Sequence, residues 1–384
     1  MNIIFLSNYY NHHQAPLCSA LSAQTDVAFR FIACGEMTEE RREMWGEWSC
    51  LPDFVFVPKS QADWDKVSQD ILDADAVIVG SAPQALLRER LKAGKLIFRY
   101  QERPLKNGAE PLKLLPRLLR WHMWNPPGKP VYLLCASAYA AGDYAKMGLF
   151  RGKAYKWGYF PETRLYDIRA LLAQKEAGSI FWAGRFLDWK HPDDALRAAA
   201  RLRDDGYVFK LRIAGAGVLE PLLRDMISRL HLGGCVQLLG SLSPEQVRIE
   251  MERSEIFLFT SDRREGWGAV LNEAMNSGCA VAASDAAGAA PFLVKDGVNG
   301  SVYHSGDTQE LYEKVRRLLD DTAAQDGFGS AAYQTIAELW NAETAAKRLL
   351  QLSQTLLEGQ NAAKLFADGP CSPAHPLRED WYRK

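Results

Sequence analysis

The sequence predicts an α/β protein made of two successive doubly wound β/α domains, and two observations lead to that prediction. Short apolar runs alternate with amphipathic stretches along residues 1–147, and the same alternation starts again after an irregular segment at 148–164. A continuous apolar run is typical of a strand buried on both faces, and amphipathic helices between such strands favour a parallel sheet. Each array therefore predicts one sheet covered by helices.

The individual elements follow from the same pattern. We expect the strands of the first array at 2–7, 27–33, 75–80, 95–100 and 131–137. We expect those of the second array at 179–184, 209–215, 235–240, 255–260 and 279–284, with helices at 192–203, 218–230 and 268–277. The boundary falls near residue 160, which gives domains 1–160 and 161–359.

Composition limits the function. A chain of 384 residues with 47% hydrophobic and 24% charged residues and a net charge of −1 has no polyanion-binding character, so nucleic acid is not the expected partner. The 7 cysteines are scattered without a C-x-x-C pair, as expected for reduced thiols. The apolar run at the N-terminus is too short for a signal peptide, and no window approaches a transmembrane helix. We expect a cytoplasmic protein.

The stretch REGWGAVLNEAM, residues 264–275, reads as a loop that enters a helix. Glu265 lies in the loop, and Glu273 lies in the second helical turn, away from a buried stripe of Leu271, Ala274 and Met275. The two acids are therefore not expected to face each other as a catalytic pair. Gly278 should end the helix in left-handed geometry.

Two glycines precede this helix and suit a phosphate ligand. Gly266 and Gly268 let the backbone approach a ligand closely, and the first amides of a helix are unpaired and lie at the positive end of its dipole. A phosphate site flanked by carboxylates fits a ligand with hydroxyls on either side of its phosphates. A nucleotide sugar is such a ligand.

These motifs resemble those of the retaining glycosyltransferases of GT-B fold known as family 4. Glu265 and Glu273 meet the family's E-x7-E motif, and residues 277–303 are similar to its usual continuation. The upstream family motif is met by residues 182–202, and IAGAG at 213–217 resembles its glycine turn. LLGSLSPEQV at 238–247 is similar to its base-binding strand end. The resemblance covers about 180–303 and is much weaker over the first domain.

The resemblance implies two Rossmann-like domains facing a central cleft, and a role for each motif residue. Glu265 would hold hydroxyls of the donor sugar and Glu273 the ribose, while Arg185 and Lys190 would neutralise the diphosphate. The catalytic set is then Glu265, Arg185 and Lys190. Further donor contacts are expected at Gly266, Trp267, Gly268, Gly215, Leu239 and Gly240. Neither a metal nor a cofactor is required.

Each of these residues also has a purely structural interpretation. Glu265 can be a loop acid and Glu273 a solvated helix acid, because surface glutamates are common. Arg185 and Lys190 can be ordinary loop charges. The acidic pair Asp73 and Asp75 precedes a buried strand, and we interpret it as turn acids and not as a metal site.

The first domain offers a second group of candidates. Asn11, His12 and His13 follow the first strand, in a loop that can contact either the acceptor or the diphosphate, or can simply pack. The two histidines lack a third ligand at metal spacing, which argues against zinc. Glu102 follows another strand, where it can face the cleft or form a structural ion pair.

Two outlying segments remain. Residues 111–125 mix basic residues with leucines, Trp121 and Trp124, and either contact an anionic membrane or pack on their own domain with the tryptophans in the core. We expect residues 360–384 to cross back to the first domain, by resemblance to the GT-B fold.

The resemblance thus implies a retaining, metal-independent hexosyltransferase that uses a nucleotide-sugar donor, with UDP favoured by family frequency. The expected acceptor is a saccharide or a lipid-linked saccharide, in the synthesis of a cell-surface polysaccharide or glycolipid. The enzyme would be cytoplasmic, with peripheral contact to the inner face of the membrane left open. Two alternatives also remain open: a nucleotide-sugar epimerase or hydrolase on the same fold, and an inactive nucleotide-sugar-binding partner protein.

Overall fold

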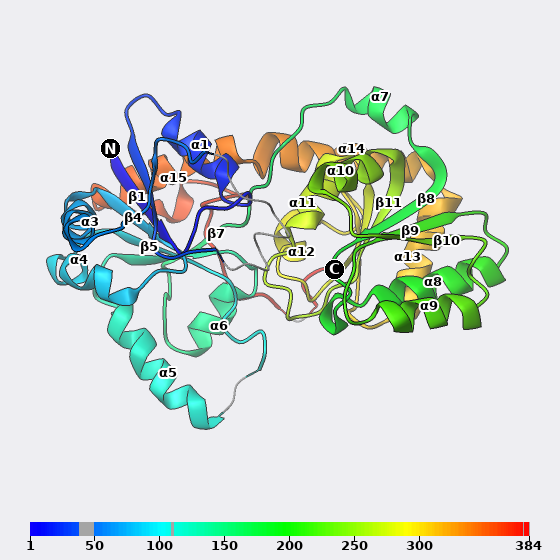
Figure 1. Ribbon diagram of the computed structural model, residues 1–384, viewed down its shortest axis with the longest axis horizontal. Helices are drawn as coiled ribbons and strands as arrows, with labels where there is room; N and C mark the ends of the chain where they lie inside the picture. Colours follow the sequence, from blue (N-terminus) through cyan, green and yellow to red (C-terminus); the bar gives the residue numbers. More distant parts are fainter. Residues whose placement is uncertain (38–49, 109–110, 379, 384) are drawn as a thin grey trace. The chain divides into compact units, whose positions relative to one another are not determined.

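The structure is a computed structural model that describes residues 1–37, 50–108, 111–378 and 380–383, with no side-chain description for 111–114. The chain divides into two compact units (Figure 1). Unit 1 comprises Met1–Pro161 and Ala342–Leu377, and unit 2 comprises Glu162–Asn341 and the residues from Arg378 onward.

The return to the first unit begins earlier than the predicted residue 360. Helix α15 (Ala342–Leu357) packs against α1 (Ala15–Ser22), which places the whole of α15 in unit 1. The last residues, in turn, belong with unit 2, where the Trp381 indole donates a hydrogen bond of 3.3 Å to the Asp285 carbonyl.

Unit 1 is built on a parallel sheet with helices on its faces. Among the described residues the strand order is β3-β2-β1-β4-β5-β6-β7. The strands are β1 (Asn2–Ser7), β2 (Ala28–Ala33), β3 (Val55–Phe56), β4 (Ala76–Val79), β5 (Ile97–Gln101), β6 (Val131–Cys135) and β7 (Ala154–Lys156). Besides α1 and α15, its helices are α3 (Gln61–Asp73), α4 (Arg88–Ala93), α5 (Pro111–Trp124) and α6 (Ala140–Lys146).

Unit 2 repeats this plan. Its described strands form a parallel sheet of order β10-β9-β8-β11-β12-β13. They are β8 (Glu176–Ala183), β9 (Lys210–Ala214), β10 (Val236–Gly240), β11 (Ser254–Phe259), β12 (Ala280–Ser284) and β13 (Ser301–Tyr303). The helices are α7 (Ile168–Ala173), α8 (Pro192–Asp204), α9 (Glu220–Arg229), α10 (Pro244–Arg253), α11 (Ala269–Asn276), α12 (Ala290–Leu293), α13 (Thr308–Asp320) and α14 (Thr322–Gln334).

The two predicted arrays of strands are confirmed. β10, which was predicted as a strand, is the edge strand of its sheet, and only Val236 in it is buried. The short strands β3, β7 and β13 were not predicted, because two or three residues carry no readable periodicity. Gly278 has a φ of +66° directly after α11, as its predicted stop position requires.

The strand order decides where ligands can bind. In each sheet the chain runs outward in one direction from the first strand and then reverses, so β1 and β4 are neighbours in unit 1, and β8 and β11 are neighbours in unit 2. Open parallel sheets bind ligands beyond the carboxyl ends of the strands at this reversal point. Each unit therefore has one favoured place for a site.

Candidate functional site

The loops that follow β8 and β11 lie at the reversal point of unit 2 and carry most of the predicted residues. Arg185 and Lys190 lie between β8 and α8, and Glu265, Trp267 and Gly268 lie between β11 and α11. The amphipathic helices α8 and α11 cover the sheet with buried side chains such as Leu196 and Leu271, and so fix where these loops begin and end. The structure thus brings the two predicted motifs to one edge of the sheet.

Main-chain hydrogen bonds continue beyond the strand ends of β8, β9 and β10. The Gly184 amide donates to the Ala214 carbonyl at 3.0 Å, and the Gly215 amide donates to the Gly240 carbonyl at 2.8 Å. Gly215 has a φ of +145°, and a Cβ added there would lie 1.9 Å from the Gly184 carbonyl oxygen. Only glycine fits at Gly215, and this close contact shapes the loop that leads to Arg185.

Lys190 and Glu265 form an ion pair at this edge. The Lys190 ammonium donates to the Glu265 carboxylate, which also accepts a hydrogen bond of 3.1 Å from the Ser261 hydroxyl. The two side chains are only 16% and 13% exposed, so water screens the pair weakly. The Thr260 hydroxyl holds the Lys190 carbonyl at 2.6 Å. An acid and a base from distant motifs therefore sit side by side, held by the end of β11.

Arg185 lies on the other side of the same loop, with its side chain exposed. The next residue, Phe186, is buried, and its amide donates to the Ala216 carbonyl at 2.8 Å. This anchor fixes the backbone at Arg185 while its guanidinium stays on the solvent side.

The entry into α11 is formed by a glycine that no other residue can replace. Gly268 is the residue before the helix, with a φ of +92°, and a Cβ added there would lie 2.3 Å from the Phe259 ring. The first turn of α11 contains no acidic side chain. The helix therefore places no carboxylate of its own beside its N-terminal amides. These amides and the positive end of the helix dipole favour the binding of an anion.

The Trp267 side chain is fully buried. The donor contact that we predicted for this residue would therefore come from its main chain. The indole nitrogen donates to Asn272 Oδ1 at 2.8 Å, and the ring packs against Phe292 and Trp340 at centroid distances of 6.3 and 6.0 Å. The Trp267 side chain is part of the core of unit 2 and anchors the loop between β11 and α11.

Glu273 lies in the second turn of α11, where Leu271, Ala274 and Met275 are buried as predicted. Desolvation raises the pKa of the Glu273 carboxyl, against the opposing effect of Arg248. The Glu273 carbonyl accepts a hydrogen bond of 3.2 Å from the Arg248 guanidinium. Glu273 is therefore only partly exposed to solvent, unlike the solvated helix acid of its structural interpretation.

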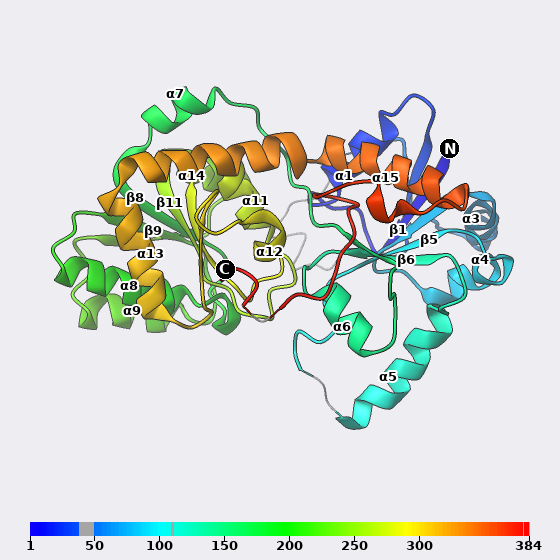
Figure 2. The same ribbon diagram turned by 180° about the vertical axis from the view of Figure 1, so that it is seen from behind.

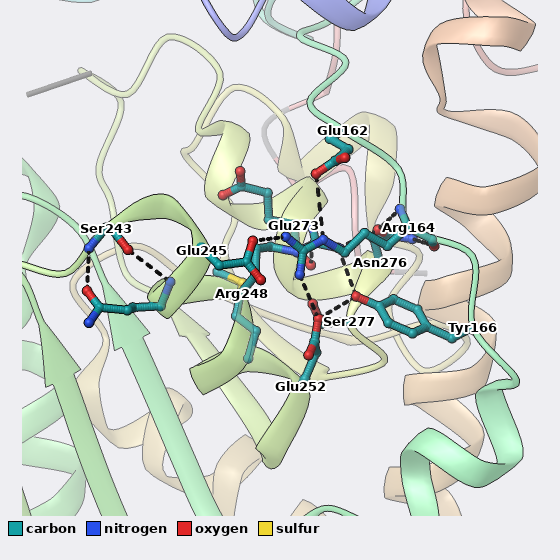
Figure 3. Close-up of polar contacts among 12 residues, drawn as sticks. Glu162, Arg164, Tyr166, Ser243, Glu245, Arg248, Glu252, Glu273, Asn276 and Ser277 are labelled. Atoms are coloured by element: carbon teal, nitrogen blue, oxygen red, sulfur yellow. Dashed lines mark hydrogen bonds and ion pairs between the residues drawn. The ribbon is translucent and has the colours of Figure 1, made fainter. Parts of the chain in front are cut away.

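A polar network holds the back of α11, and sequence reasoning missed it (Figure 3). The Arg248 guanidinium donates to Asn276 Oδ1 at 2.6 Å, and the same oxygen accepts from the Arg164 amide at 2.8 Å. The Arg164 side chain donates to Glu252 at 3.0 Å. The network ties the first residues of unit 2 to α10 and α11. No local motif could have revealed it, because its members come from separate segments.

Leu239 and Gly240 lie at the end of β10. Both are partly exposed, and Gly240 has a φ of +72°. The Gly240 carbonyl already accepts a hydrogen bond from the Gly215 amide. The end of β10 therefore offers a ligand mostly main-chain groups.

Unit 1 has a pocket of about 430 Å³ at its own reversal point. Ser7 and Gly80, at the ends of β1 and β4, line it together with Asn11, His13 and Glu102. Asn11 donates to Gln14 at 3.1 Å and Gln14 donates to Ser7 at 3.2 Å, so the polar side chains form a preset chain of hydrogen bonds.

Glu102 forms the ion pair that one of its two sequence interpretations predicted, while its orientation toward an interdomain cleft stays a prediction. It lines the pocket and also forms an ion pair with Lys106 at 2.6 Å. The Tyr159 hydroxyl donates to the same carboxylate at 2.8 Å, and the Tyr159 ring stacks with His13. His12 is not among the residues that line the pocket, and burial lowers its pKa, which keeps the ring neutral at pH 7.

One cluster of side chains has the spacing of a metal site. Among the described residues, His191, Asp193 and Asp194 have ligand atoms within 4.8 Å of one another. Arg197 forms ion pairs with both carboxylates, at 2.9 and 3.0 Å, so the chain already supplies a cation there. Asp75 accepts a hydrogen bond of 2.7 Å from the Asn2 amide at the start of β1. No helix in the described part of the chain is long and apolar enough to cross a membrane.

Comparison with known proteins agrees with this geometry. Residues 166–335 match the family described as "Glycosyl transferases group 1". The amylovoran biosynthesis glycosyltransferase AmsK of Erwinia amylovora is 29% identical over 200 residues, which are 51% of this chain and 49% of that protein. An exopolysaccharide phosphotransferase of Streptomyces coelicolor is 26% identical over 191 residues, 50% of this chain and 20% of that protein. The matched region spans about half or less of these curated relatives.

The whole-chain architecture has counterparts among solved structures. The crystal structure of HepE from Anabaena in complex with UDP matches with a TM-score of 0.67 and 18% sequence identity, over 92% of this chain and 100% of that chain. This likeness, with the two parallel sheets, confirms the predicted GT-B fold. The family match supports the predicted resemblance to glycosyltransferases.

Proposed function

We propose that the protein is a retaining, metal-independent glycosyltransferase of family 4. It transfers a hexosyl group from a nucleoside diphosphate sugar to a saccharide or a lipid-linked saccharide, in the cytoplasm, during synthesis of a cell-surface polysaccharide or glycolipid. The observation that carries the proposal is the meeting of Lys190, Glu265 and the glycine-bounded start of α11 at one edge of the second sheet. The named role of AmsK supports the polysaccharide class, and the UDP bound to HepE favours a UDP donor.

On this proposal the donor lies across the start of α11. Its diphosphate is held by the helix amides, Lys190 and Arg185, its sugar hydroxyls bond to Glu265, and its ribose bonds to Glu273. In the structure Lys190 and Glu265 form an ion pair. The ammonium must then be shared between the carboxylate and the phosphate, so each group orients the other while the donor binds.

The chemistry follows from where charge develops. The bond between the anomeric carbon and the β-phosphate oxygen breaks, and the departing diphosphate gains negative charge. Fixed cations and helix amides at that point stabilise the transition state more than the bound donor. The acceptor oxygen bonds to the anomeric carbon on the face that the diphosphate leaves, and its proton passes to the departing phosphate. Glu265 positions the sugar and forms no covalent bond.

We place the acceptor in the pocket of unit 1. Among the described residues that line it, none is a lysine or an arginine, and the polar groups of the walls are hydroxyls, amides, the His13 imidazole and the Glu102 carboxylate. Neutral His12 adds no charge nearby. Such a lining suits a saccharide ring, whose hydroxyls donate to Glu102 and Asn11, and not a diphosphate. Of the two ligands that the sequence left open for this loop, we therefore choose the acceptor.

The test is a panel of UDP, GDP, ADP and CMP sugars, incubated with free and lipid-linked saccharides and scored for nucleotide release and for new glycosides. Proton NMR of the anomeric signal should show the donor configuration kept in the product, and EDTA should not reduce the rate. Glu102→Gln should raise the KM for the acceptor while leaving the affinity for the nucleotide unchanged, and Glu220→Gln on exposed α9 serves as the matched control.

The competing functions give different results. Donor consumption without an acceptor, yielding a free or epimerised sugar, would indicate a hydrolase or an epimerase. Tight donor binding without turnover on any acceptor would indicate an inactive binding partner. Inversion at the anomeric centre, or loss of activity with EDTA that is restored by a divalent metal, would contradict the proposed mechanism.

A further inference from the structure

Helix α5 carries a row of exposed apolar side chains. Leu115, Leu119 and Met123 are 65%, 65% and 62% exposed. They are four residues apart, so they lie on one face of the helix. Large apolar side chains that gather on one face, and are not scattered singly, mark a surface that another body covers.

Other side chains of α5 fix the helix to unit 1. The Trp121 ring packs against Tyr144 at a centroid distance of 5.8 Å, and His122 Nε2 lies 2.9 Å from the Met147 carbonyl. Trp124 packs against the hydrophobic core of the unit. The tryptophans therefore belong to the domain side, as one of the two sequence interpretations held, and Leu115, Leu119 and Met123 form the outer face. Both views show α5 extending away from the sheet of unit 1 (Figures 1 and 2).

The charge of this segment is one-sided. The sequence has no aspartate or glutamate from 111 to 142 but contains Lys113, Arg117, Arg120 and Lys129, in a chain whose net charge is −1. Arg117 and Arg120 are exposed, and Arg117 lies over the Trp121 ring at 4.6 Å. A row of exposed apolar side chains with basic side chains nearby complements a surface that has an apolar interior and anionic groups on its outside.

We propose that α5 docks unit 1 onto an anionic lipid bilayer. Leu115, Leu119 and Met123 enter the boundary between headgroups and acyl chains, and the exposed Arg120 contacts lipid phosphates. The helix lies in the plane of the interface, since it is too short and too charged to cross it. A second copy of the chain is a poorer occupant, because a symmetric contact would bring two acid-free basic segments together. This inference does not depend on the donor chemistry, although a lipid-linked acceptor would be presented on such a surface.

The inference is tested by flotation of the full chain with vesicles of phosphatidylcholine alone and of phosphatidylcholine with phosphatidylglycerol. Wild type should float with the anionic vesicles and stay behind with the neutral ones, and salt should weaken the binding. The triple variant Leu115→Ser, Leu119→Ser, Met123→Ser should lose roughly 1000-fold in partitioning, because burying each of the three side chains is worth roughly tenfold. Arg120→Glu should lose roughly tenfold or more, because it reverses a charge at the surface.

The matched control removes the same number of exposed apolar side chains from unit 2. Val208, Ile249 and Val298 are 94%, 48% and 49% exposed, and their triple serine variant should float like wild type. Thermal melting of all variants checks that each is folded. Equal flotation of the two triple variants, or equal binding to neutral and anionic vesicles, would overturn the proposal. So would a wild-type dimer in light scattering that the α5 triple variant dissociates while neither protein binds vesicles.

Discussion

The Lys190–Glu265 pair gives the sharpest test of the site geometry by stability alone. We consider Lys190→Met, Glu265→Gln and the double variant. Because the side chains are 16% and 13% exposed, removing one partner leaves the other mostly out of water. Breaking a fully buried pair costs about 3–5 kcal/mol. Here some water remains and Ser261 still donates to Glu265, so we expect roughly 2–3 kcal/mol for each single variant.

The coupling energy is the decisive quantity. A charged hydrogen bond of this kind should couple the two positions by about 1.5–3 kcal/mol, so the double variant should cost clearly less than the sum of the single ones. The assay is urea unfolding of the four proteins. The control cycle uses Arg224→Met and Glu220→Gln on α9, a pair that is 65% and 33% exposed and should couple by only about 0.3–0.5 kcal/mol. A Lys190–Glu265 coupling no larger than that of the control pair would refute the reasoning.

Three further predictions concern other parts of the chain. Gly215→Ala should destabilise unit 2 by more than about 3 kcal/mol, because its Cβ would overlap the Gly184 carbonyl, whereas Gly240→Ala, which has open space, should cost only about 1–2 kcal/mol in urea unfolding. Lys175→Met should cost about 2–4 kcal/mol by the same measurement, because its ammonium nitrogen lies 2.7 to 3.1 Å from four main-chain carbonyl oxygens, which share its three N–H donors. A change below about 1 kcal/mol would show that water replaces the ammonium. His12 has a pKa lowered from 6.5 by burial, so the unfolded chain binds the proton first as the pH falls, and stability should drop below pH 6.5. His12→Asn should reduce this drop between pH 7.5 and 5.5 by at most about 1.4 kcal/mol, and an unchanged slope would contradict the burial argument.

The sequence predicted the sheets well because their signal is local. A strand such as β8 or β11 is read from consecutive apolar residues, and the stop of α11 is read from one glycine, Gly278. The edge position of β10 depends on which strand lies beside it, and no local pattern contains that information. The same holds for the early return of the chain at Ala342, which depends on the packing of α15 against α1.

The candidate site shows where sequence reasoning ends. Glu265, Lys190 and the glycines were found from motifs, but the pairing of Lys190 with Glu265 joins residues far apart in the chain. The burial of the Trp267 side chain could not be predicted from its neighbours in the chain, Gly266 and Gly268. Its actual partners, Phe292 and Trp340, lie in other segments. Arg248 was missed for a related reason, since its role behind α11 depends on distant Asn276.

The central claim is that the edge of unit 2 binds a nucleoside diphosphate sugar through these residues, and titration calorimetry of the intact protein tests it most directly. Wild type should bind one of the UDP, GDP, ADP or CMP sugars, and both Lys190→Ala and Glu273→Ala should weaken that binding at least tenfold. Glu265→Gln should bind the free nucleoside diphosphate at least as well as wild type, because Lys190 no longer shares its charge. Absence of binding to every nucleotide sugar, or wild-type affinity in both alanine variants, would contradict the account.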